Sequence, residues 1–198
     1  MAVTADQVKE LRERTGAGMM ECKKALQESQ GDFEKAVEVL RKSGIARAAS
    51  RSGRAASEGV VESYIHPGNR VGVLIEVNCE TDFVARTDEF LELVRNLAMQ
   101  VAAVGAEFVR REDVPVERVE REREILKAQT EGQGKPAAIV EKIVTGKLEK
   151  FYSEICLLEQ PYIRDDKTTV GDLVRQASSR TGENIQVCRF VRFRLGQE

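Results

Sequence analysis

The spacing of apolar residues over the first quarter of the chain predicts helices. Apolar side chains recur every three or four positions over residues 5–14 and 19–29, and again from Phe33 onward, as they do in helices with one buried face. Thr4 is expected to cap the first helix and Gly44 to end the third. This stretch therefore predicts a compact three-helix bundle.

Further along, the period changes from that of a helix to that of a strand. Residues 71–78 alternate between apolar and other side chains, and residues 59–66 alternate more weakly. Pro67-Gly68-Asn69 between them is strong turn chemistry, so the two segments predict a β-hairpin. The apolar positions of Ile185–Leu195 share a face, which predicts a third strand that pairs with this hairpin.

Helical spacing returns after Thr87, and this helix is expected to pack on the sheet. Residues 116–130 are helical but so highly charged that only a narrow face can be buried. Pro136 suits the first turn of a following helix, and the two predict a protruding antiparallel helical hairpin. A last helix is expected between Thr168 and Gly182.

Together these elements predict an α+β fold in three parts. Residues 1–44 form a three-helix bundle similar to a ubiquitin-associated module, a fold that more often binds a partner than performs chemistry. Residues 45–58 are rich in Ala, Ser and Arg and are interpreted as a linker. Residues 59–198 form a core of a small antiparallel sheet packed with helices. The alternative for the linker is an RNA-binding arm that uses Arg47, Arg51 and Arg54.

Composition argues against several classes of function. The 198 residues carry 31 basic and 33 acidic side chains, a net charge of −2, which does not favour direct binding of nucleic acid. No apolar run is long enough to cross a membrane, and no signal-peptide pattern opens the chain. The four cysteines are widely scattered, which is typical of reduced thiols in the cytosol.

Residues that could support catalysis are scarce. His66, the only histidine, stands alone at the hairpin turn, so a histidine-based metal site is excluded. The glycines Gly16 and Gly18 lack the lysine of a phosphate loop. Glu80 and Asp82 point in different directions on an extended segment and make a poor acid–base pair. The chain is expected to be no enzyme and to use no metal or cofactor.

Phe83 is not explained by the strand alternation before it or by the helical spacing after it. It lies in the connection between a strand and a helix, directly after Asp82, and neither flanking pattern assigns it to the core.

Two stretches, TGAGMMECKKAL (15–26) and VNCETDFVAR (77–86), closely resemble those of the bacterial elongation factor Ts family. The opening VKELRERTGAGMMECKKALQESQGDFEKAVEVLRKSG and the closing PYIRDDKTTVGDLVRQASSRTGENIQVCRFVRFRLG are also similar to that family. The resemblance implies a guanine-nucleotide exchange factor for elongation factor Tu, which it would bind in both GDP-bound and nucleotide-free states. It also implies a translation factor of the bacterial cytoplasm, or of an organelle, without a cofactor.

The resemblance also implies which residues contact elongation factor Tu. In the family a TDFV segment intrudes into the nucleotide domain of the partner and disturbs its magnesium site. The matching residues, called the TDFV segment below, are Thr81, Asp82, Phe83 and Val84.

Two further contacts follow from the resemblance. Arg12, Met19 and Met20 match residues of the N-terminal module that touch the same domain, although core packing is the alternative for at least one of the methionines. His66 matches a core histidine near the partner's other domain.

The core unit occurs here in a single copy, whereas long members of the family carry two. SYIHPGNRVGVL (63–74) runs directly into VNCETDFVAR, so one hairpin combines features that the long forms divide. Half a core leaves a sheet edge or apolar face uncovered, which predicts a homodimer through the strand Ile185–Leu195.

Two other functions stay open at this point. One is an RNA- or ribosome-binding module that uses the linker arginines together with Arg189, Arg192 and Arg194. The other is an adaptor that works through residues 1–44 alone.

Overall fold

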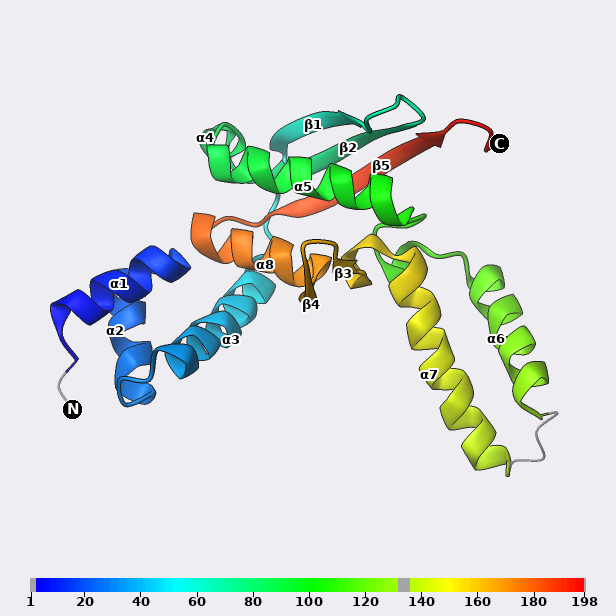
Figure 1. Cartoon of the computed structure of the whole chain (residues 1–198), viewed down its shortest axis with the longest axis horizontal. Helices are drawn as coiled ribbons and strands as arrows, with labels where there is room; N and C mark the ends of the chain where they lie inside the picture. The colour runs from blue at the N-terminus through cyan, green and yellow to red at the C-terminus, as the bar shows by residue number, and fades with distance from the viewer. Residues whose placement is uncertain (1–2, 132–135, 198) are drawn as a thin grey trace. The chain divides into compact units, whose positions relative to one another are not determined.

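The computed structural model describes residues 3–131 and 136–197, and its fold is α+β (Figure 1). Among the described residues, helices and strands follow the predicted order, and two short 3₁₀ turns, one additional small hairpin and the helical turn α4 are added, the last in a segment that was expected to be extended. In chain order the elements are α1 (Ala5–Thr15), α2 (Met19–Glu28), α3 (Phe33–Arg51), β1 (Glu58–Ile65), β2 (Val71–Cys79), α4 (Asp82–Ala85), α5 (Asp88–Val104), η1 (Arg111–Asp113), α6 (Val116–Glu131), α7 (Ala137–Ile155), η2 (Leu157–Glu159), β3 (Pro161–Tyr162), β4 (Asp165–Thr169), α8 (Val170–Thr181) and β5 (Gln186–Arg194).

The chain forms two compact units, each assembled from three stretches of sequence. The first unit holds the N-terminal helices, the TDFV segment and most of α8, and the second holds most of the sheet and the α6–α7 hairpin. Their bounds are Met1–Val60, Val77–Leu93 and Asp172–Gln186 for the first unit, and Val61–Glu76, Val94–Gly171 and Val187–Glu198 for the second. The division into domains at residues 44/45 and 58/59 stays a prediction.

The three N-terminal helices of the first unit enclose a small core of their own. Thr4 caps α1 as predicted, because its hydroxyl accepts from Gln7 N at 3.3 Å while the Gln7 side chain accepts from Thr4 N at 3.0 Å. Asp32 caps α3 through a 3.1 Å bond from Lys35 N. The buried members of this core are Val8, Leu11, Cys22, Ala25, Leu26, Ala36 and Leu40.

The predicted end of the third helix at Gly44 was wrong, since α3 continues to Arg51. Gly44 is instead an interior helix position where a Cβ atom would lie 2.8 Å from the Ser179 hydroxyl oxygen. The Arg51 guanidinium, inside the stretch 45–58 that was expected to be linker, donates to Ser178 O at 3.3 Å. Contact with α8 thus compensates for the low helix propensity of glycine.

The sheet has the strand order β1-β2-β5, so the last strand pairs with the hairpin as predicted. In the second unit, Val73 and Ile75 of β2 are buried, as are Leu97 and Val101 of α5. The opposite face of the sheet remains largely open. The small β3–β4 hairpin, in which Pro161 faces Thr169, was not predicted.

The predicted helical hairpin is present in the second unit, where α6 and α7 lie side by side (Figure 1). A narrow apolar seam of Leu126, Val140, Val144 and Leu148 joins them. At the base, the Arg118 guanidinium donates to both carboxylate oxygens of Glu107, at 2.5 and 2.8 Å. The highly charged α6 therefore buries only the narrow face that its sequence predicts.

The close approach of β1 and β2 at Gly59 provides a test of this packing. Gly59 has a φ of 145°, and a Cβ atom there would lie 2.3 Å from Val77 O and 2.7 Å from Asn78 Cα. We expect Gly59→Ala to lower the free energy of unfolding by about 2 to 4 kcal/mol, because backbone atoms cannot move aside cheaply. Urea unfolding measures the change.

Gly146 in α7 is the matched control, because it is exposed, helical and has no atom within 4 Å of an added Cβ. Gly146→Ala should raise stability by up to about 1 kcal/mol. Equal effects of the two substitutions would show that the contact at Gly59 is not tight.

Candidate partner-binding site

The TDFV segment forms a single helical turn, α4, that leaves its aromatic side chain in solvent. Thr81 is the N-cap: its backbone is extended and its hydroxyl accepts from Val84 N at 3.4 Å. Asp82 forms an exposed ion pair with Arg86 at 2.9 Å. Phe83 is 82% exposed, the largest exposed fraction among the large apolar side chains of the described residues.

A carboxylate from a distant part of the chain holds the backbone below this turn. Glu183 Oε2 accepts from Glu80 N at 3.0 Å and from Thr81 N at 3.1 Å, and Glu183 Oε1 accepts from the Thr81 hydroxyl at 2.6 Å. In return, the Glu80 carboxylate accepts from Asn184 N at 2.7 Å. Residues 80–81 and 183–184 are therefore joined in both directions.

Cys79 supports the same turn from the core side. Its thiol is buried and donates to Thr81 O at 3.1 Å. Burial, with a smaller contribution from the negative charge of Glu183, raises the pKa of Cys79 to about 11. The thiol is therefore neutral at physiological pH and acts as a small apolar support with one weak hydrogen bond.

The residues expected to bind from the N-terminal module are all exposed. Met20 is 75% and Met19 45% exposed, so neither methionine follows the alternative of core packing. Arg12 lies exposed on α1. These residues belong to the same compact unit as the TDFV segment.

Arg180 of α8 connects the two parts of this unit. It forms an ion pair with Glu89 at the start of α5, and its side chain lies against Gly16 between α1 and α2. The loop that precedes α2 is thereby tied to the helix that follows the TDFV segment.

His66 lies in the second unit, directly after β1. It is exposed, and its Nδ1 is 3.1 Å from the Tyr64 hydroxyl. Its backbone is fixed by the β1–β2 turn, because His66 N donates to Val71 O at 2.9 Å.

Comparison with known proteins shows the family to which the chain belongs. The family described as "Elongation factor TS" matches residues 3–197. The protein named elongation factor Ts from Carboxydothermus hydrogenoformans is 61% identical over 195 residues, which cover 98% of this chain and 90% of the relative. The protein of the same name from Moorella thermoacetica is also 61% identical, over 98% of this chain and 96% of the relative.

The chain belongs to the elongation factor Ts family. Membership makes it a translation elongation factor, as the two motifs at 15–26 and 77–86 indicated. The matched residues make up 90% and 96% of these two relatives, so the relatives are of similar length to this chain.

The arginines considered for RNA binding mostly have partners within the chain. Arg54 pairs with Glu80 at 3.4 Å, and Arg189 Nε donates to Glu76 at 2.7 Å. Arg192 donates to Ala102 O at 3.3 Å. The side chain of Arg47 lies outside the described residues. These pairings do not favour the RNA-binding alternative for a member of the elongation factor Ts family.

The described residues contain no group of three His, Cys, Asp or Glu side chains that could hold a metal ion. Over residues 3–131 and 136–197, no helix is long and apolar enough to cross a membrane.

Sequence reasoning did not find Glu183 or Asn184. The only local signal was their place after Gly182, where a helix was expected to end. A carboxylate directly after a helix and before an apolar strand has many ordinary explanations, so its partner some 100 residues earlier could not be inferred from spacing.

The raised pKa of Cys79 leads to a pH dependence of stability. The unfolded thiol, with a pKa near 9.0, loses its proton at lower pH than the folded one. Above pH 9 the unfolded state therefore binds fewer protons, and stability should decrease as the pH rises from 9 to 11. Thermal unfolding at several pH values in this window measures the decrease, which should be shallower in Cys79→Ala. Identical pH dependence of the two proteins would contradict this role of the thiol.

Proposed function

We propose that the chain is the guanine-nucleotide exchange factor of elongation factor Tu and acts by inserting the TDFV segment near the magnesium and nucleotide site of that partner. The observation that carries the proposal is Phe83, which is 82% exposed on a turn fixed by five hydrogen bonds around residues 80–84. Membership of the elongation factor Ts family supplies the identity of the partner.

An exchange factor needs no chemical step of its own. It must bind the empty, distorted partner more tightly than the nucleotide-loaded one, because only a difference in affinity shifts an equilibrium. Burial of a phenylalanine contributes roughly 1.5 to 3 kcal/mol, and here the gain arises only where helices of the partner have separated. The chain would therefore act without catalysis and without a cofactor.

The other contacts are proposed from the same family match. Arg12, Met19 and Met20 would hold the nucleotide domain, and the two methionines suit this because they are exposed and adaptable. His66 would approach the partner's other domain from the β1–β2 turn. We infer the bacterial cytoplasm as the compartment, since the relatives are bacterial proteins.

Phe83→Ala separates a binding role from a packing role. A core phenylalanine would lose about 3 to 5 kcal/mol of stability on truncation, whereas an exposed one should lose little. We expect an unchanged melting temperature and a roughly thirtyfold slower release of a fluorescent GDP analogue from elongation factor Tu, equivalent to about 2 kcal/mol. Asp82→Ala should act in the same direction with a smaller effect.

Val116→Ala is the control, because Val116 is an exposed apolar residue, 66% accessible, in the second unit. It should leave release unchanged. A Phe83→Ala protein that melts early but promotes release at the normal rate per folded molecule would contradict the proposal.

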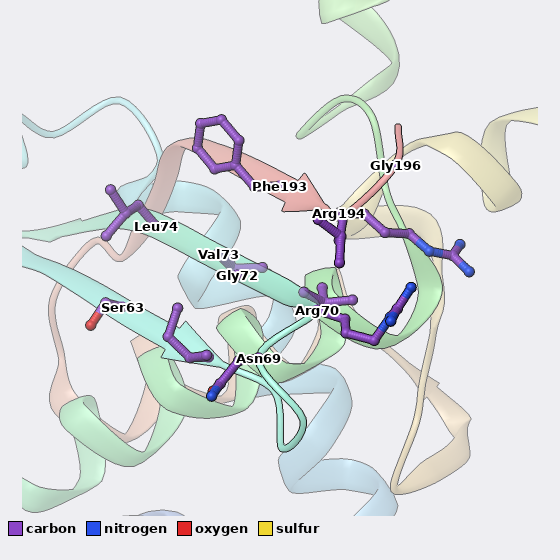
Figure 2. Close-up of a pocket in the computed structure, with 12 residues that line it drawn as sticks. Ser63, Asn69, Arg70, Gly72, Val73, Leu74, Phe193, Arg194 and Gly196 are labelled. Carbon is purple, nitrogen blue, oxygen red and sulfur yellow. The ribbon is translucent and has the colours of Figure 1, made fainter. Parts of the chain in front are cut away.

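We also propose that the protein is a homodimer through the open face of the sheet. Leu74 of β2 and Phe193 of β5 lie on neighbouring strands beside a shallow hollow of about 650 Å³ (Figure 2). Five large apolar side chains on strands β1, β2 and β5, or directly after β5, are 46–69% exposed. They are Val61, Ile65, Leu74, Phe193 and Leu195.

A second copy of the same face is the occupant that fits these side chains. A contiguous apolar face on a single chain favours an interface, and a two-fold axis would cover both copies at once. The single copy of the core unit in the sequence supports this occupant, because half a core leaves an apolar face uncovered.

Phe193→Glu tests the dimer. We expect the parent protein to scatter light at micromolar concentration as twice the 22.1 kDa mass of one chain, and Phe193→Glu to shift toward the mass of one chain. A buried, unpaired carboxylate at the centre of an apolar contact is strongly unfavourable. Val116→Glu makes the same change at an exposed position of α6 and should leave the mass unchanged. A parent protein with the mass of one chain would exclude the dimer.

A further inference from the structure

We infer that Glu183 is a positioning residue for nucleotide exchange: its carboxylate fixes the backbone from which Phe83 projects. The inference rests on the proposed function of the TDFV segment and adds a residue to it that lies outside the motif. Glu183 does not need to touch elongation factor Tu in order to act.

The first ground is the number and type of hydrogen bonds at one carboxylate. Both oxygens of Glu183 are engaged, one with the backbone N–H groups of Glu80 and Thr81 and the other with the Thr81 hydroxyl. Bonds of an ionised carboxylate to such donors are shorter and stronger than neutral ones. Because all three donors belong to two consecutive residues, the carboxylate fixes their orientation as well as their position.

The second ground is the role of the Thr81 hydroxyl in the helical turn. This hydroxyl donates to Glu183 and accepts from Val84 N. One oxygen atom therefore connects the Glu183 carboxylate, the anchor of the turn, to the backbone of α4. A helix of one turn is not stable by itself. The direction in which Phe83 leaves the surface therefore depends on how firmly Thr81 is held.

The third ground is that the anchor is itself held. Asn184 is 3% exposed, and its side chain donates to Arg54 O at 2.7 Å and to Ser52 O at 3.4 Å. Its backbone N–H donates to Glu80 at 2.7 Å. The segment that carries Glu183 is thus fixed to the residues after α3, and the carboxylate has a rigid base.

Preorganisation explains why this matters for exchange. If only a fraction of molecules hold the turn in the binding conformation, the apparent affinity falls by that fraction. Loss of the anchor should raise the concentration of exchange factor needed for half-maximal release and leave the maximal rate nearly unchanged. Truncation of Phe83, which removes the contact itself, should lower the maximal rate.

The test is a double-mutant cycle between Glu183 and Phe83, read as GDP release from elongation factor Tu over a range of exchange-factor concentrations. Glu183→Ala should raise the half-maximal concentration about tenfold, if about a tenth of molecules keep the turn in place. Glu183→Gln preserves shape and one accepting oxygen and should recover most of this loss. In the Phe83→Ala background, Glu183→Ala should add less than about twofold, because two residues that act through one contact are not additive.

Amide hydrogen exchange supplies a readout independent of activity. In Glu183→Ala the N–H groups of Glu80 and Thr81 should lose protection, whereas those of buried β2 residues should keep theirs. Glu107→Ala is the control, because it also removes a carboxylate in an ion pair, here the pair with Arg118 in the second unit. It should change neither the rate of GDP release nor the protection of the turn.

The outcomes separate this inference from the function beneath it. If Phe83→Ala slows release but Glu183→Ala raises the half-maximal concentration equally in both backgrounds, Glu183 acts elsewhere. The inference is then overturned while the proposed function stands. If Glu183→Ala promotes GDP release from elongation factor Tu as well as the parent protein does, the inference is also overturned. If Phe83→Ala promotes GDP release as well as the parent protein does, the proposed function fails, and the positioning role of Glu183 fails with it.

Discussion

Hydrogen bonds hold the backbone of residues 80–84, from which the exposed Phe83 projects, and this constraint joins three segments of the first unit. One helical turn is not stable by itself. Here the Glu183 carboxylate, just after α8, accepts hydrogen bonds from the backbone that leads into the turn. That carboxylate needs a fixed base, which Asn184 provides through the backbone after α3. The end of the N-terminal bundle, the TDFV segment and the end of α8 are therefore brought together.

Where local preference and tertiary packing agree, the sequence predicted the elements closely. Thr4 caps α1, and Pro67-Gly68-Asn69 turns the hairpin, because each acts through bonds within a few residues. The exposure of Phe83 was also predictable, since a residue that fits neither flanking period has no partner in its own core. Elements with a strong period could thus be assigned without knowledge of the fold.

Where tertiary contact overrides local preference, prediction failed. Gly44 reads as a helix end, but its missing Cβ admits the Ser179 side chain, and α3 continues. Asp165–Thr169 has few strand-forming residues, yet it pairs with Pro161–Tyr162. Glu183 was missed for the same reason, because it acts through a contact with Thr81 that no local sequence pattern indicates.

Under the proposed function, the exposure of Phe83 has a thermodynamic reason. If the ring packed within the free protein, moving it into the partner would exchange one apolar environment for another and yield little net free energy. In the proposed mechanism, a ring kept in water gains the full free energy of burial, and it gains it only from the opened partner. The polar anchor beneath it supplies order without covering the ring. Glu183 and Thr81 can therefore hold the TDFV segment rigid in the free protein and still leave the free energy of burying Phe83 to be gained on binding.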